Sequence, residues 1–159
     1  MPVPEIASLT RLYSRPGFLL RRAHQISTAV FESECSAVNL TPAQFGVLTV
    51  LNAYPGIDQS SLARALGLDK VTMLRVLRVL EPRGLVQRAA SPSSRRNLSI
   101  LLTPEGRKLL KTAQKPAERA YHRLLSPLDT AQQEQLLGLL QLLSNGLDGM
   151  ARAPFVPPN

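Results

Sequence analysis

The stretch Asp58–Leu102 constrains the fold most, because two short helical patterns, a tight turn and two strand patterns follow each other within it. Residues 58–66 predict the first helix, residues 67–68 a turn built on glycine, and residues 69–80 the second helix. An aspartate opens each helix, and a carboxylate there accepts the unpaired amide hydrogens of the first turn. The spacing therefore predicts a helix-turn-helix.

The second helix of this pair has two different faces. Met73, Val76 or Leu77, and Leu80 recur at helical spacing and predict a stripe that faces the core. The residues left on the outside are Lys70, Val71, Leu74, Arg75 and Arg78. Cations mixed with small apolar groups suit the major groove of DNA, where arginine reaches guanine edges and apolar groups contact thymine methyls.

A hairpin follows these helices. Residues 85–88 begin its first strand, residues 91–94 form the turn, and residues 97–102 form the returning strand. Arg95 and Arg96 lie at the junction, where cations can reach phosphates or a narrow minor groove. Two helices followed by such a hairpin predict a winged helix-turn-helix.

Charge agrees with a nucleic-acid partner. The 159 residues carry a formal net charge of +8, which favours a polyanionic partner. The cations of the two proposed DNA-facing elements are Lys70, Arg75, Arg78, Arg88, Arg95 and Arg96. The absence of a long apolar run and of a secretion-signal pattern, together with one cysteine, favours a single cytoplasmic domain.

A helix is expected from residue 17 or 18 to about residue 37, and it carries two stripes. One stripe, the usual core or dimer face, comprises Leu19, Ala23, Ile26 and Val30. The other comprises His24, Thr28, Phe31 and Cys35, which are spaced by four, three and four residues. This second stripe resembles the wall of a small polar-aromatic pocket, but a packed face with a satisfied histidine has the same pattern.

Three further helices are expected. One begins at Thr41-Pro42 and ends before Pro55; a second begins at Thr103-Pro104 and is kinked or interrupted at Pro116. The third begins at Asp129 and is too rich in leucine for a half-buried helix, so it requires a partner. Residues 1–16 predict an arm that is disordered or ordered against another subunit, and residues from 153 onward predict a frayed end.

Catalytic patterns are missing from the sequence. It contains no His-x-x-x-His, no phosphate-cradling glycine loop and no Gly-x-Ser-x-Gly. His24 and Cys35 are eleven residues apart, about 16 Å along one helix, which is too far for a nucleophile and its base. We therefore expect no enzyme, no metal site and no cofactor.

The same residues resemble the MarR family of bacterial transcriptional regulators. The resemblance covers roughly residues 17–145. It is carried by Leu40-Thr41-Pro42-Ala43-Gln44-Phe45, Leu66-Gly67-Leu68-Asp69-Lys70, Gly84-Leu85-Val86, Arg95-Arg96 and Leu102-Thr103-Pro104-Glu105-Gly106. Ser91 and Ser94 depart from it, since this family usually has acids there that brace the wing; Pro82 departs as well and predicts an early end to the second helix.

The resemblance implies a mainly α fold with a small β wing, in which N- and C-terminal helices form a homodimer. Residues 57–102 would be the winged helix-turn-helix, and residues 17–56 and 103–150 the helical dimerisation and ligand region of a single domain, 1–159. The dimer would bind double-stranded DNA at a pseudo-palindromic operator. We expect base contacts from Val71, Leu74 and Arg75, phosphate contacts from Ser60, Ser61, Lys70 and Thr72, and wing contacts from Arg95 and Arg96.

A narrower resemblance concerns the ligand. Residues 17–26 and Phe31…Glu34-Cys35 look like the subgroup that senses aromatic carboxylates, including regulators of nicotinate breakdown. An aromatic acid needs a cation or imidazole for its carboxylate and an apolar slot for its ring. Arg22 and His24 would serve the carboxylate, and Thr28, Phe31, Phe45 and Leu48 the ring. The expectation is a repressor of an aromatic-acid catabolic operon that a hydroxynicotinate-like or benzoate-like acid releases from DNA.

Two alternatives remain at this point. Cys35 would allow a peroxide-sensing repressor, although oxidant-sensing members carry their cysteine near the start of the first helix, not near its end. A basic helical scaffold protein that does not read DNA has a similar composition. It would bind DNA only weakly, in a manner that salt removes.

Overall fold

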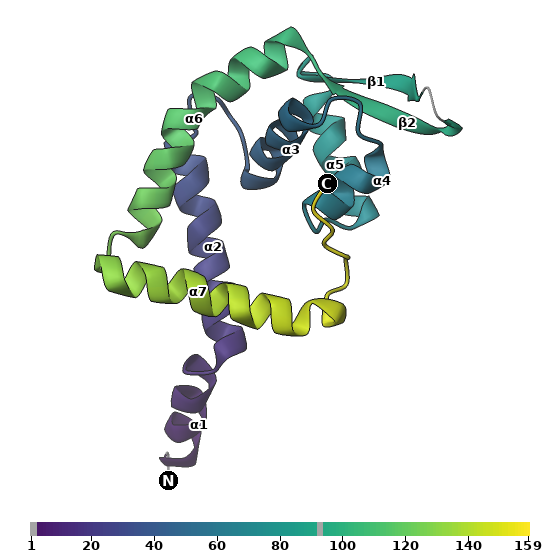
Figure 1. Cartoon of the computed structure of the whole chain (residues 1–159). Coiled ribbons are helices and arrows are strands. Elements are labelled where there is room, and N and C mark those ends of the chain that lie inside the picture. The colour runs from purple at the N-terminus through teal and green to yellow at the C-terminus, as the bar shows by residue number, and fades with distance from the viewer. Residues whose placement is uncertain (1–2, 92–93) are drawn as a thin grey trace.

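The computed structural model describes the backbone of residues 3–91 and 94–159, and the side chains of residues 8–91 and 98–159 (Figure 1). Within these residues the chain is mainly helical and carries one two-stranded sheet. The order is α1 (Val3–Tyr13), α2 (Pro16–Glu34), α3 (Pro42–Ala53), α4 (Gln59–Ala65), α5 (Lys70–Leu80), β1 (Val86–Ser91), β2 (Ser94–Leu102), α6 (Pro104–Leu125), α7 (Thr130–Leu147) and the short 3₁₀ turn η1 (Asp148–Met150). None of the described helices combines the length and apolarity that crossing a bilayer needs.

The expected helix-turn-helix is confirmed, with both caps in place. Asp58 accepts the amide hydrogen of Ser61 at 2.9 Å, and Asp69 accepts that of Thr72 at 2.7 Å. Gly67 lies in the turn between α4 and α5 with φ of 61°, a conformation that a side chain would strain. The cap residues and this glycine therefore define the ends of the two short helices.

The sheet forms the wing. β1 and β2 are antiparallel, with Val86 opposite Leu102 and Ser91 opposite Ser94, so the returning strand starts three residues before the expected Asn97. The strands therefore pair closer to the tip of the hairpin than the polar residues near Ser94 suggested. At its base, the Ile100 amide donates to the Ile57 carbonyl at 3.0 Å, and Asp58 forms an isolated antiparallel bridge with Ser99.

One hydrophobic core joins α4 and α5, called the reading helices below, to α3 and the sheet. Its largest fully buried side chains come from α3, α4, α5 and β2, and are Leu48, Leu51, Leu62, Met73, Leu77, Leu80 and Ile100. The stripe of α5 expected to face inward is therefore buried. α5 ends at Leu80, two residues before Pro82, as the proline predicted.

Helices α2 and α6 pack against each other and form the other side of the molecule. α6 continues through Pro116 as one helix whose axis bends (Figure 1), so the proline kinks the helix and does not interrupt it. Glu34 at the end of α2 accepts hydrogen bonds from Arg119 at 3.1 Å and Arg123 at 3.0 Å. These two bonds hold the pKa of the Glu34 carboxyl below its usual value and clamp α2 to α6.

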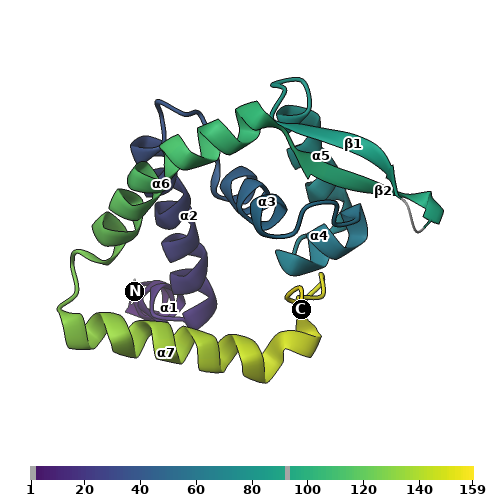
Figure 2. The ribbon, with the colours of Figure 1, turned by 45° about the horizontal axis from the view of Figure 1, so that its top comes forward.

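The last helix exposes an apolar surface. α7 starts at a capping box between Asp129 and Gln132. Its exposed leucines include Leu136, Leu137, Leu139, Leu140, Leu142 and Leu143. Leu142 is 71% exposed. Figure 2 shows α7 at the opposite side of the molecule from the wing. The N-terminal arm is not irregular along residues 3–13, because these form helix α1.

The segment after η1, residues 151–159, does not fray as expected. It has no regular secondary structure, but it runs from the end of α7 back to the reading helices (Figure 1). The Val156 amide donates to the Arg64 carbonyl at 2.9 Å, and the Tyr54 hydroxyl donates to the Pro158 carbonyl at 3.4 Å. Prolines prevent a helix or strand here, yet backbone hydrogen bonds to distant residues still hold the segment.

Candidate DNA-reading face and ligand pocket

The outward face of α5 is the first candidate surface. Lys70, Val71 and Arg75 are exposed on it, and Thr72 and Leu74 are half-buried beside them. Val71 is 61% exposed although it is apolar. At the start of this helix, the hydrogen bonds that Thr72 donates to Asp69 hold the pKa of the Asp69 carboxyl below its ordinary value. The helix thus presents cations and bare methyl groups from a firmly capped first turn.

Helix α4 contributes one serine to this surface and uses the other internally. Ser60 is exposed, whereas the Ser61 hydroxyl donates to Asp58 at 2.7 Å. A hydroxyl has one hydrogen to donate, so Ser61 cannot give it to a phosphate while this bond exists. In this structure the Ser61 hydroxyl therefore caps α4, and its contact with a phosphate stays a prediction. The same bond is the main reason that the pKa of Asp58 is lowered.

A hollow of about 420 Å³ lies between the starts of α4 and α5 and the wing strand β2. Its lining is Asp58, Gln59, Ser60, Ala63, Arg64, Lys70, Met73 and Leu98. Gln59 and Arg64 were not among the DNA-contacting residues expected from the sequence. The signal for Arg64 was available, because it follows Ser60 by four residues on one helix and so shares its face.

Of the three arginines of the wing, the structure describes the side chain of Arg88. Arg88 on β1 contacts Glu81 at 2.8 Å and donates to Gln59 at 3.0 Å, so it ties the wing to α4 and to the end of α5. The backbone of Arg95 and Arg96 belongs to β2, while their side chains lie outside the described residues. The guanidinium of Arg88 is therefore engaged within the protein.

A second hollow, of about 370 Å³, lies between α2, α3 and α6. It is lined by Ser27, Phe31, Phe45, Gln114, Ala117, Glu118, Ala120, Tyr121 and Leu124. The Phe31 and Phe45 rings meet at a centroid distance of 5.6 Å and a tilt of 58°. Sequence reasoning identified these two aromatic walls but missed the contributions of α6, because nothing in the sequence indicates which face of α6 meets α2.

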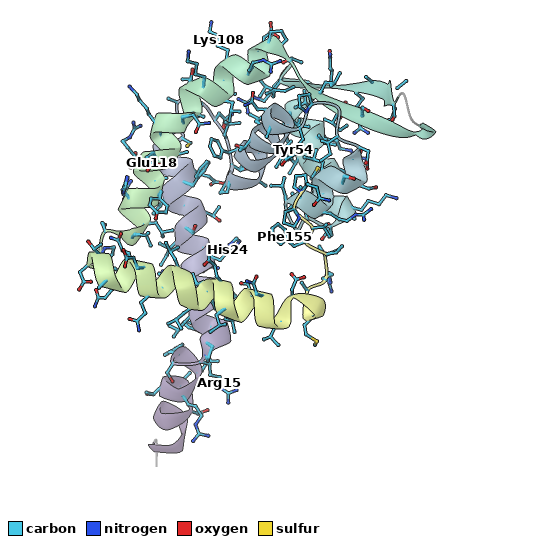
Figure 3. All side chains as sticks on the ribbon, viewed as in Figure 1. Arg15, His24, Tyr54, Lys108, Glu118 and Phe155 are labelled. Atoms are coloured by element: carbon cyan, nitrogen blue, oxygen red, sulfur yellow. The ribbon has the colours of Figure 1, made fainter. Side chains whose placement is uncertain are left out.

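The other expected ligand residues are divided by the structure. His24 precedes Ser27 by three residues and Phe31 by seven, so it lies one turn beyond the pocket on the same side of α2; Figure 3 shows it projecting from the helix. Arg22 is nine residues from Phe31, about half a turn away on the helix circumference, and its guanidinium donates to Gln25 at 3.4 Å.

Thr28 and Leu48 are not brought into the pocket lining either. Thr28 is half-buried on α2 beside the lining residues, and Leu48 is fully buried in the core behind them. The two arginines of α6 that come close to this region, Arg119 and Arg123, already pair with Glu34. The single-chain pocket thus has aromatic walls and a carboxylate, Glu118, with the imidazole of His24 one turn away along α2.

The cysteine lies under this region. Cys35 has no exposed surface, and burial raises the pKa of its thiol. A reactive thiol needs access and a lowered pKa, so neither property of Cys35 favours oxidant sensing.

Comparison with known proteins identifies the chain. Residues 40–98 match the model of the MarR family. A putative transcriptional regulatory protein for the hcr operon of Thauera aromatica is 32% identical over 128 residues, covering 80% of this chain and 77% of that protein. The chain belongs to the MarR family. The members it resembles are transcriptional regulators and not enzymes.

Two solved MarR-family structures extend this comparison. The repressor CouR bound to a 23-mer DNA duplex is 37% identical, with a TM-score of 0.76, covering 84% of this chain and 94% of that one. BpsR of Bordetella bronchiseptica, whose DNA binding is regulated by 6-hydroxynicotinic acid, is 30% identical, with a TM-score of 0.78, covering 83% and 94%. CouR has also been solved with p-coumaroyl-CoA. These likenesses confirm the winged-helix fold expected from the sequence.

Proposed function

We propose that this MarR-family protein is a homodimeric repressor of an operon for the breakdown of an aromatic acid, and that the acid releases it from DNA. The observation that carries the proposal is the position of the aromatic-walled pocket. It lies between α2, α6 and α3, and α3 also packs against both helices of the reading pair. A ligand there contacts the element on which the reading helices rest.

For DNA, the outward residues of α5 take the specific contacts. Arg75 meets base edges with Val71 and Leu74, and Lys70 and Ser60 meet phosphates together with the backbone around Thr72. The arginines of the wing, Arg95 and Arg96, meet the flanking minor groove. The support is that Lys70, Val71 and Arg75 are exposed on α5, that Ser60 and Lys70 line the first hollow, and that the related CouR was solved on a DNA duplex.

For the ligand, the ring sits between Phe31 and Phe45, and its carboxylate points toward His24. The orientation follows from charge, because Glu118 in the lining repels a carboxylate and accepts a hydrogen bond from a ring hydroxyl or N–H. Such an acid is hydroxybenzoate-like or hydroxynicotinate-like. The related BpsR responds to 6-hydroxynicotinic acid, and CouR binds the aromatic thioester p-coumaroyl-CoA.

Release from DNA requires that the acid bind one conformation better than the other. The coupling free energy equals this difference in binding free energy between the free and DNA-bound forms. A ring wedged between Phe31 and Phe45 separates α2 from α3 and so favours the form in which α3 has moved. Because the coupling is reciprocal, DNA must weaken binding of the acid by the same factor.

The dimer is formed by residues 17–56 and 103–150, which flank the winged helix at 57–102. The support is the unburied apolar side of α7 together with Leu19 and Ile26 of α2, which are 53% and 44% exposed. Contiguous apolar surface of this kind marks an association site. In the dimer the two copies of α5 face successive major grooves of a pseudo-palindromic operator.

The test uses fluorescence anisotropy of a labelled duplex selected from a random pool by the wild-type protein. 4-Hydroxybenzoate and 6-hydroxynicotinate should release the duplex, whereas 4-hydroxybenzyl alcohol, which lacks the carboxylate, should not. His24→Gln should raise the acid concentration needed for release, and Lys111→Gln, which removes an exposed cation of α6, should not. If no aromatic acid changes DNA affinity, the ligand assignment is wrong while the DNA assignment stands.

A further inference from the structure

The segment 151–159 contacts the part of the chain that sets the geometry of the reading helices. Its Val156 amide donates to the carbonyl of Arg64 at the end of α4. Phe155 lies over the turn, since a Cβ placed on Gly67 would be 3.8 Å from the Cβ of Phe155. Figure 3 shows Phe155 and Tyr54 on the same side of the winged helix. The segment therefore covers the turn between α4 and α5.

This docking brings a cation from outside the winged helix to its reading side. Arg152, the second residue of the segment, is exposed and lies three residues before Phe155, which covers Gly67 two residues before Asp69. Its positive charge is one of the influences that lower the pKa of Asp69. Arg64 exerts the same influence on Asp58. Each N-cap carboxylate of the reading pair thus has an arginine near it.

The arrangement matters for a polyanionic partner. A phosphate that approaches the first turn of α5 meets the exposed carboxylate of Asp69, which repels it, although the positive end of the helix dipole attracts it. A neighbouring guanidinium offsets that repulsion and can itself bind the phosphate. Sequence position gives no hint of this, because Arg152 is 83 residues from Asp69.

We propose that residues 151–159 are a working part of the DNA-reading unit, docked on the α4–α5 turn so that Arg152 contacts a phosphate beside the start of α5. This inference rests on the proposed DNA binding and extends it to a segment outside the winged helix. The segment also connects α7 directly to the turn between α4 and α5. A shift of α7 in the proposed dimer can therefore move these helices through α6 and through this segment.

The charge is tested with Arg152→Ala, and with Lys108→Ala as a control that removes a cation pointing away from the reading helices (Figure 3). Binding is measured over a series of salt concentrations, on the selected duplex and on a random-sequence pool. Loss of one phosphate contact should lower the salt slope by about 0.9 and weaken both complexes about eightfold at ~0.1 M salt. A slope equal to that of Lys108→Ala overturns the contact.

The docking is tested with Val156→Pro, which removes the amide hydrogen donated to Arg64 and leaves Arg152 in place. Val156→Ala keeps that hydrogen and is the control. Val156→Pro should reduce affinity and salt slope in the same direction as Arg152→Ala, and Val156→Ala should match the wild type. A wild-type result for Val156→Pro overturns the docked arrangement. Absence of DNA binding by the wild-type protein would instead refute the proposed function itself.

Discussion

Substitution of Gly106 by alanine should destabilise the protein at the joint between the wing and α6. Gly106 is buried in the first turn of α6, and its amide donates to the Thr103 hydroxyl at 3.0 Å. A Cβ at this position would overlap the backbone carbonyl oxygen of Leu85 and would lie 2.7 Å from a methyl group of Leu102. The methyl group can rotate away, but the carbonyl belongs to the backbone and cannot.

Both sides of this contact are held in place. The Leu85 carbonyl accepts the Thr103 amide at 3.1 Å, and the Thr103 hydroxyl donates to the Gly84 carbonyl at 2.6 Å. Overpacking costs about 1–3 kcal/mol, and weakening one of these hydrogen bonds adds about 0.5–1.5 kcal/mol. Alanine regains about 1 kcal/mol over glycine in a helix. The sum is a loss of about 2 kcal/mol, or roughly 4–8 °C in Tm for a chain of this size.

Thermal unfolding followed by far-ultraviolet circular dichroism, at one fixed protein concentration, measures this loss. Gly46→Ala is the matched control, because the same substitution inside α3 meets only the end of the flexible Leu66 side chain at 3.1 Å. That control should change Tm little, since the helix gain offsets a contact that can relax. Equal Tm values for Gly106→Ala and the wild type would refute the reasoning, as would a larger loss for Gly46→Ala.

Three further predictions follow from the caps, the reading face and the exposed helix. Asp58→Ala should cost about 1 kcal/mol at neutral pH. Because the native pKa of Asp58 is lowered, its stabilisation is present above the unfolded value and is lost as the pH falls below about 4, so urea unfolding should show the difference from wild type shrinking in acid. Arg75→Ala should weaken the selected duplex by about 1–3 kcal/mol more than a random pool in anisotropy titrations, and equal losses would remove it from the specific contacts. Leu142→Glu should shift the dimer toward monomer in sedimentation velocity, since this leucine is 71% exposed in one chain; an unchanged dimer would contradict a role for this part of α7.

The winged helix could be predicted in detail because its signals are local. The caps of α4 and α5, the glycine turn and the buried stripe of α5 each depend on residues within about one helical turn of each other. Only part of the pocket lining, namely Phe31 and Phe45, could be predicted from the sequence. The aromatic face of α2 shows in its spacing, but the partner face on α6 depends on how two helices pack across the chain.

Two side chains have hydrogen-bond partners that the sequence did not indicate, because each polar side chain has only a limited number of hydrogens to donate. Ser61 was expected to face phosphate, but its hydroxyl hydrogen goes to Asp58. Arg88 counted among the basic residues of the wing, but its guanidinium goes to Glu81 and Gln59. A sequence shows that a donor is present, but only the folded structure shows which acceptor lies within hydrogen-bond distance of it.

Residue order alone therefore determined the caps of α4 and α5, which faces are apolar and which family the chain resembles, because these properties come from neighbours a few positions apart. Packing of distant segments decided which cations remain available, which half of α2 borders a cavity, and where residues 151–159 lie. The Val156–Arg64 hydrogen bond joins positions 92 residues apart, and its formation depends on the path of α6 and α7 through space. No local pattern encodes that path, since it results from the burial of apolar surface over the whole chain.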